Sequence, residues 1–235
     1  METTVGDPGW LRFVCESRAE FYKRQFGPLP ATIHKLINLS EIWIEGGIYQ
    51  MAAPRLGGLG VCLTSGLTNP DLPARWTLVK REDGREVVEP REPRSVPDGL
   101  AGYGYELAIL TPQPDPWPLL TLSWFVQMEI LRDVCLLDHL AAGNGVTVEG
   151  VALGDGSRLG HFLVQPACSP VLARVPLPNG LLHLLIATWI TDDELEFAKT
   201  TDDGRFVLLN RLVDAGIGPV SRLDRPSIFQ TTKPG

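Results

Sequence analysis

Three ionisable residues of this sequence, Glu106, Asp138 and His139, could together perform acid–base chemistry. A carboxylate and a histidine that meet in a cleft can activate a water molecule, as a small hydrolase requires. Glu106 stands out because it lies in the stretch GYGYELAIL, residues 102–110, among aromatic and aliphatic neighbours. A catalytic acid, a structural carboxylate with hydrogen-bond partners, and part of a protein-binding surface are three hypotheses for it.

The sequence motifs of the common enzyme classes are absent. The chain has no G-x-S-x-G elbow, no H-E-x-x-H motif, and no glycine-rich loop of the phosphate-binding or dinucleotide-binding type. It contains only four histidines, and two of them, His161 and His183, lie in apolar strand-like segments that favour a core role. We therefore predict that the protein is not an enzyme and has no catalytic residues.

Metal-ligating patterns are incomplete. Cys135 and His139 have the spacing of one helix face, but two ligands do not complete a tetrahedral zinc site. An acidic cluster lacks the alternating ligands of a calcium loop and is typical of helix N-termini. Its members are Asp192, Asp193, Glu194, Asp202 and Asp203. The four widely separated cysteines indicate reduced thiols, and we predict neither a metal nor a cofactor.

Composition and charge exclude further classes of function. The 21 Lys and Arg residues against 28 Asp and Glu give a net charge of −7, without a basic cluster. Nucleic acid is not an expected partner, because phosphates are neutralised by clustered positive charge. The N-terminal METTVGDPGW lacks a secretory signal, and the apolar run 180–190 is too short for a bilayer. We expect a cytoplasmic protein without a membrane partner, whose oligomeric state the sequence leaves open.

Four helices are predicted to position the candidate residues. The first begins at Pro8 and is ended by Gly27, since Pro favours a helix start and Gly a helix end. The nearly continuous apolar character of residues 117–133 predicts a buried central helix. A Thr191–Glu194 capping box predicts a short helix to about Lys199, and residues 205–214 form the pattern of another.

Strand-like segments account for much of the remaining chain. They are residues 31–37, 42–51, 58–65, 74–81, 102–110, 146–153, 159–166 and 181–190. In residues 102–110, alternation places the odd-numbered residues 103–109 on one face and the even-numbered residues 104–110 on the other. Residues 81–99 have mixed charge, three prolines and little periodicity, which predicts an exposed loop insertion. With residues 230–235 as a tail, we expect one domain over residues 1–235.

The order of several motifs is similar to that of a known family. GYGYELAIL (102–110), a Pro-rich break and a helix that begins with Trp-Pro resemble the G-[FY]-G-[FY]-E-L signature and following W-P helix of the Suppressor of fused (SUFU) domain. TSGLTNP (64–70) resembles its S-x-G-L-S-x-L segment, and CLLDH (135–139) resembles its G-D-H stretch. Residues 178–195 resemble its T-P-x-G, strand and T-x-x-E-L helix. The resemblance extends over residues 8–229.

The resemblance implies a fold, a function and roles for five residues. SUFU domains are α/β (α+β) folds that bind proteins and have no established catalytic activity, so we expect a mixed, largely antiparallel sheet packed with helices. In the animal proteins the domain holds a Gli peptide as an added strand near the aspartate of the G-D-H stretch. Asp138 matches that aspartate and is the predicted protein-binding residue. The structural strand signature is Tyr103, Gly104, Tyr105 and Glu106, and the Glu106 carboxylate is predicted to bond to backbone amides or hydroxyls.

Departures from the family pattern bear on the partner. LVQPACSP (163–170) lacks the acidic pair that family members often carry there, and we expect no second domain after Pro226, so we do not expect a Gli-like clamp. Stand-alone SUFU domains of this length resemble bacterial proteins proposed as immunity proteins, which neutralise toxins by binding them. An acidic protein would associate rapidly with a basic toxin. We thus expect a non-enzymatic binding protein with a toxin or other protein as partner, and keep a scaffold protein and a small hydrolase as alternatives.

Overall fold

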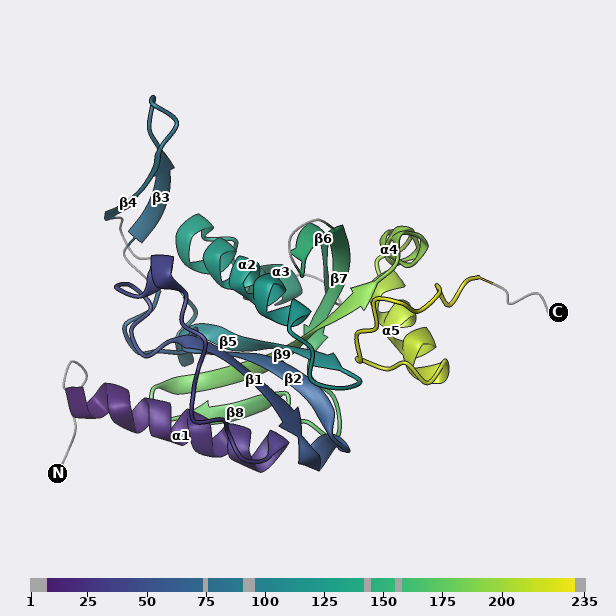
Figure 1. Cartoon of the computed structure of the whole chain (residues 1–235), viewed down its shortest axis with the longest axis horizontal. Helices are drawn as coiled ribbons and strands as arrows, with labels where there is room; N and C mark the ends of the chain where they lie inside the picture. Colours follow the sequence, from purple (N-terminus) through teal and green to yellow (C-terminus); the bar gives the residue numbers. More distant parts are fainter. Residues whose placement is uncertain (1–7, 74–75, 91–95, 142–144, 155–157, 231–235) are drawn as a thin grey trace.

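The computed structural model describes residues 8–73, 76–90, 96–141, 145–154 and 158–230. Within these residues the chain forms a seven-stranded sheet in the order β1-β2-β5-β9-β7-β6, with β8 also paired to β9, and a separate hairpin of β3 and β4 (Figure 1). The strands are β1 (Gly47–Ala53), β2 (Leu59–Ser65), β3 (Trp76–Lys80), β4 (Glu86–Pro90), β5 (Leu100–Thr111), β6 (Val146–Leu153), β7 (Arg158–Pro166), β8 (Arg174–Leu177) and β9 (Gly180–Ile190).

Only β5 and β9 pair in parallel, and every other strand pair in the described chain is antiparallel. Helices cover both faces of the sheet (Figure 1). They are α1 (Pro8–Phe26), α2 (Trp117–Arg132), α3 (Leu136–Ala141), α4 (Asp192–Lys199) and α5 (Gly204–Asp214), with short 3-10 helices η1 (Ile37–Leu39) and η2 (Pro54–Leu56). The predicted α/β fold with a mixed, largely antiparallel sheet is confirmed.

The predicted helices agree closely with the structure. Helix α1 starts at Pro8 and ends before Gly27, and α2 covers the predicted apolar segment. At α4 the Thr191 side chain and the Glu194 carboxylate form the predicted capping box with each other's backbone amides. These ends were predictable because proline, glycine and capping residues act through local backbone geometry.

Two predictions of local structure were wrong, and the strand predicted at residues 42–51 begins only at Gly47. Residues 31–37 do not form a strand; His34 makes an isolated bridge to Ile48, and Ile37 begins η1. Residues 81–99 are not simply a loop, because β4 lies within them and pairs with β3 in a hairpin that projects from the body (Figure 1). Strand β3 lies within the predicted segment 74–81, whereas β4 escaped detection because its few apolar residues are surrounded by charges. Residues 91–95 lie outside the described chain.

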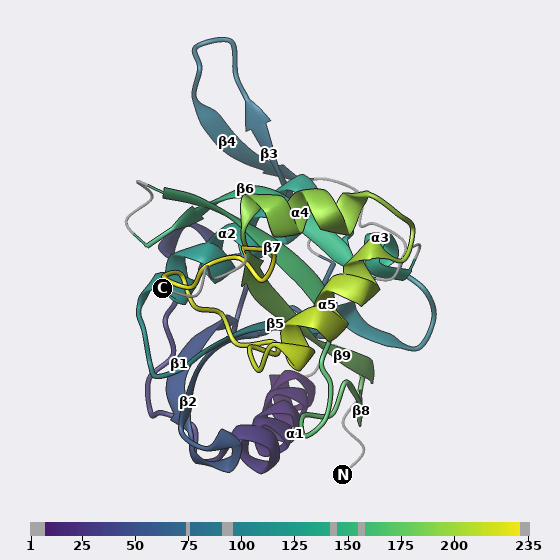
Figure 2. The same cartoon turned by 90° about the vertical axis from the view of Figure 1, so that its right-hand side faces the viewer.

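The sheet has a hydrophobic core on each face. The odd-numbered side chains of β5 that the alternation predicted to share a face, from Tyr103 to Ile109, pack with α2. Ala108 and Leu110 point to the opposite face and pack in the cluster that contains α1 residues. In Figure 2 the helices α4 and α5 lie nearest the viewer, at the end of the sheet where they pack on β7 and β9. Strand β5 is thus buried on both faces.

Candidate functional site

Glu106 is fully buried, and each of its carboxylate oxygens has a hydrogen-bond donor. The Thr64 hydroxyl donates to Oε2 at 2.7 Å, while the Gly66 amide donates to Oε1 at 2.8 Å. Thr68 donates to Oε1 twice, from its amide at 3.0 Å and from its hydroxyl at 2.6 Å. All four donors belong to the segment 64–70 that resembles a separate family motif, so the two motifs form one buried unit.

A buried arginine completes this unit from helix α1. The Arg18 guanidinium lies 3.9 Å from the Glu106 carboxylate and donates to Thr68 Oγ1 at 3.1 Å and Asn69 Oδ1 at 2.8 Å. Burial is the largest influence and acts to lower the pKa of Arg18, but the charge of Glu106 and the nearby tyrosine and cysteine groups together outweigh it, so the pKa is raised. Sequence analysis missed Arg18, although its position four residues after Val14 and four before Tyr22 places it on the apolar helix face.

The other signature residues of β5 are also buried or tightly packed. Tyr105 donates its hydroxyl to Glu129 Oε2 of α2 at 2.9 Å, and that oxygen also accepts the Leu136 amide. Gly104 has a φ of +85°, and a Cβ there would lie 2.7 Å from a Leu137 methyl group. A side chain at Gly104 would therefore strain the backbone and require the Leu137 side chain to shift.

Asp138 and His139 have a different environment from Glu106. Both are exposed on α3, whereas Glu106 lies inside the sheet with its partners toward α1. The described structure therefore does not form the Glu106, Asp138 and His139 cleft that a hydrolase would need. It instead favours the predicted structural role of the Glu106 carboxylate.

A groove of about 510 Å³ lies beside the first half of β6, near α3. His139 lines it from α3, Arg205 from the start of α5, and residues 145–149 from the strand. Strand β6 is the last strand of the sheet and has β7 as its one strand partner in the described residues. This groove is the candidate interaction site, with Asp138 as the exposed neighbour of His139.

The cysteines are reduced and do not form a metal centre in the described chain. Burial raises the pKa of Cys62 to about 12, and burial also raises the pKa of Cys15, so neither thiol is activated as a nucleophile. Cys135 precedes α3 with a φ of +60° and is not on the helix, contrary to the spacing argument. The described residues include no group of three or more His, Cys, Asp or Glu side chains placed to hold a metal.

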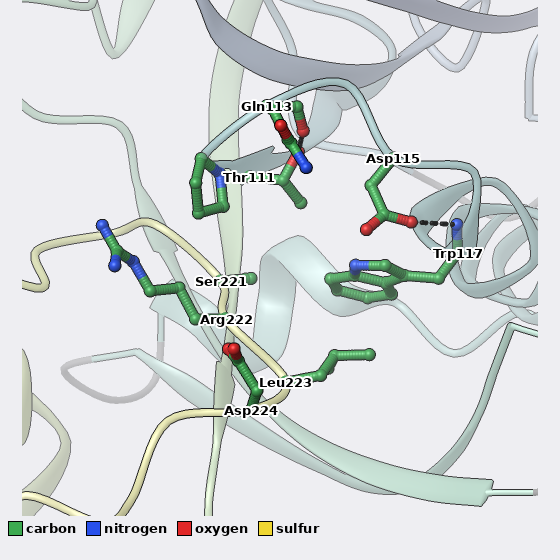
Figure 3. Close-up of a pocket in the computed structure, with 9 residues that line it drawn as sticks. Thr111, Gln113, Asp115, Trp117, Ser221, Arg222, Leu223 and Asp224 are labelled. Atoms are coloured by element: carbon green, nitrogen blue, oxygen red, sulfur yellow. Dashed lines mark hydrogen bonds between the residues drawn. The ribbon is translucent and has the colours of Figure 1, made fainter.

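A second hollow of about 440 Å³ separates the turn before α2 from the C-terminal segment (Figure 3). Asp115 accepts a hydrogen bond from the Trp117 amide at 3.1 Å on one wall, and Arg222 and Asp224 lie on the other wall. Its described lining contains neither a histidine nor a cysteine. The hydroxyls of its lining take part in structural hydrogen bonds, since Thr111 donates to the Gln113 carbonyl at 2.7 Å and Ser221 Oγ accepts from the Trp189 amide at 2.9 Å. Among the helices of the described chain, none is both long and apolar enough to cross a bilayer.

Comparison of the sequence with known protein families and with curated proteins found no match. Comparison of the fold with solved structures found several similar proteins. The chain is similar to a crystal structure of a Sufu–Fu complex, with a TM-score of 0.56 and 18% identity over 93% of this chain and 92% of that chain.

Two further structures are similar over nearly all of this chain. A SUFU homologue from Neisseria gonorrhoeae has a TM-score of 0.57 and 16% identity, covering 96% of this chain and 100% of that chain. Drosophila Suppressor of Fused has a TM-score of 0.57 and 18% identity, and its match covers 97% of this chain but 54% of the Drosophila chain. This protein therefore has the fold of the Suppressor of fused structures.

Proposed function

We propose that this protein is a non-enzymatic binding domain that holds an extended segment of a partner protein against strand β6. The observation that carries the proposal is the open outer edge of β6 beside a groove. An unpaired strand edge presents amide and carbonyl groups that a partner strand can bond, and neighbouring side-chain pockets supply selectivity. The similar Sufu–Fu crystal structure is a complex of two proteins, which is consistent with a binding role.

The two outer strands of the sheet support the choice of β6 over β1. At β1 the outer edge is partly covered, because His34 and Ile48 exchange two backbone hydrogen bonds of 2.9 Å each. For residues 146–149 of β6, the described chain provides no such backbone partner outside β7. An incoming strand would thus find bonding groups free at β6.

The side chains around the groove indicate what the partner segment carries. The walls of the groove are formed by His139 and by leucine and valine side chains. Two charged residues of opposite sign, Glu149 and Arg205, also line it. Asp138 adds an exposed carboxylate on α3. We propose that a lysine or arginine of the partner approaches Asp138 while alternate apolar residues enter the groove.

The buried environment of Glu106 favours binding over hydrolysis. A general acid or base must reach the substrate, and Glu106 is inaccessible and saturated with hydrogen bonds. The carboxylate therefore serves to hold the sheet and α1 together. The groove does not depend on it chemically.

We further propose that the partner is a basic toxin that this protein neutralises in the cytoplasm. The net charge of −7 would speed association with a basic protein, and four free cysteines suit a reducing compartment. Nucleic acid and membrane are not proposed as partners. A pure scaffold would use the same groove but would not protect cells from a toxin.

The first experiment is affinity capture from the native host with the wild type and Asp138→Lys, followed by mass spectrometry. A stoichiometric partner should be retained by the wild type and weakened by the variant. Glu41→Lys is the matched control, because Glu41 is exposed just before β1, at the opposite edge of the sheet from β6. Affinity for the purified partner should fall about tenfold or more for Asp138→Lys and remain unchanged for Glu41→Lys.

The toxin hypothesis needs a second measurement in cells. Co-expression of the wild type should restore growth to cells that produce the captured partner, and Asp138→Lys should protect less well. If the captured partner does not slow the growth of these cells, the immunity hypothesis is excluded and the scaffold hypothesis remains. Equal affinity of both charge variants and the wild type would reject the β6 site itself.

A further inference from the structure

Strands β5 and β9 separate beyond the parallel pair Ala108 and Ile186. Past this point β5 continues beside β2, to the pair of Gly60 and Thr111, while β9 continues beside β7. A segment from the C-terminal part of the chain occupies the resulting wedge. This segment is residues 219–221.

Hydrogen bonds to both strands fix the wedge segment. The Ser221 amide donates to the Leu110 carbonyl at 2.8 Å, and the Trp189 amide donates to the Ser221 hydroxyl at 2.9 Å. Val220 also forms a parallel bridge with Leu110. Residues 219–221 are therefore hydrogen-bonded into the sheet between β5 and β9. The hollow of Figure 3 lies on the face of this segment that is turned toward α2.

On the opposite face of the wedge lies a cavity of about 360 Å³. Leu110, Val171 and Ile186 form a buried apolar floor, and Val220 adds a half-buried wall. The Cys168–Val171 turn closes one side, held by the Val171 amide bond to the Cys168 carbonyl at 2.9 Å. The volume lies at the small end of the range found for ligand sites.

Arg55 gives this cavity its chemical character. It is exposed on η2 and is the single charged residue among the described lining residues. In the described part of the chain the Arg55 guanidinium forms no hydrogen bond or ion pair, unlike the buried Arg18 and Arg225. A free guanidinium at the mouth of an apolar cavity is complementary to a ligand with an apolar body and one carboxylate.

We propose that this cavity binds a small monocarboxylic acid with an aromatic or branched apolar body, whose carboxylate pairs with Arg55. The small volume of the cavity suits a compact ligand better than a long acyl chain. This site shares no residue with the groove at β6, so it is independent of the proposed partner binding.

The natural thiol of Cys168 provides the test, because it is exposed and lines the cavity. The purified protein is alkylated with iodoacetamide with and without 3-phenylpropionate, and the rate at each cysteine is measured by mass spectrometry. At ten times the dissociation constant, alkylation of Cys168 should slow about tenfold, since roughly one site in eleven remains free. Cys135 lies outside the cavity and should react at an unchanged rate.

Two comparisons test the carboxylate and the apolar cavity separately. Arg55→Gln should weaken 3-phenylpropionate binding about tenfold by calorimetry, while Arg222→Gln, an exposed arginine of the other hollow, should have no effect. The neutral 3-phenylpropanamide should bind more weakly than the acid to the wild type. Val220→Phe, which narrows the cavity, should abolish protection of Cys168 by the acid.

The proposal is overturned if millimolar acid neither protects Cys168 nor releases heat. Equal binding of the acid and the amide, with Arg55→Gln unchanged, would also overturn it, because the site would then be an unselective apolar pocket. Protection of Cys168 by a protein partner and not by the acid would assign the cavity to a protein interface. None of these results bears on the Asp138→Lys experiment.

Discussion

Glu106 and Asp138 are carboxylates of two motifs that resemble the same family, yet the fold gives them opposite environments. Glu106 has no exposed surface and accepts four hydrogen bonds near a buried arginine, whereas Asp138 extends into solvent from α3. A buried carboxylate without partners is destabilising, while an exposed one has little effect on folding. The comparison teaches that a motif residue can support the fold or remain available for recognition, and that burial separates the two cases.

The largest expected effect is that of Glu106→Ala. Removal of this carboxylate leaves the buried Arg18 without its counter-charge and the donors of residues 64–68 without their acceptor, so the free energy of unfolding should fall by about 3–5 kcal/mol. Urea unfolding followed by circular dichroism measures it. A loss below about 1 kcal/mol would contradict the structural role and reopen a functional one.

Glu194 tests whether a second buried carboxylate behaves like Glu106. Its two oxygens accept hydrogen bonds of 2.6 Å from Arg225 and bonds of 3.0 Å from the Thr191 and Ile228 amides. Burial acts to raise the pKa of Glu194, but the Arg225 and backbone hydrogen bonds outweigh it and lower the pKa below its ordinary 4.5. Glu194→Gln should cost about 3 kcal/mol at pH 7.

The pH dependence of that cost follows from the lowered pKa. The stabilisation by ionised Glu194 is complete above pH 4.5 and is lost as the pH falls through the folded-state pKa. Unfolding curves of wild type and Glu194→Gln from pH 7 to pH 3 should therefore converge at the acid end. A difference that grows with acid would have the wrong sign for this network.

A single hydroxyl gives a smaller effect. Tyr105→Phe removes the hydroxyl that donates to Glu129 and should lower the free energy of unfolding by about 1–3 kcal/mol, because a buried acceptor loses a donor. A double-mutant cycle with Glu129→Gln should show coupling between the two residues. Additive losses would mean that the hydroxyl and carboxylate do not stabilise each other.

Asp138→Asn should have the smallest effect on folding. The side chain is exposed, so the free energy of unfolding should change by no more than about 0.5 kcal/mol. The same variant should weaken partner binding, which sharpens the contrast with Glu106. A loss of stability comparable to that of Glu106→Ala would remove the distinction between the two carboxylates.

Local signals in the sequence predicted the elements well and the contacts between them poorly. The Thr191–Glu194 capping box placed α4 correctly, and alternation in residues 102–110 identified the two faces of β5. Strand β3 was predicted within residues 74–81, but its hairpin partner β4 was missed because charged residues mask a weak strand pattern. The strand predicted at residues 31–37 failed because a single bridge replaces a ladder there.

The sequence by itself determined the helix ends, the strand faces and the need for partners around Glu106, because these depend on near neighbours and on the cost of burying charge. Only the tertiary structure brought Arg18 to Glu106, left the edge of β6 open, and inserted residues 219–221 between β5 and β9. These features join segments far apart in the chain. Their formation depends on the packing of the whole sheet, which local patterns do not encode.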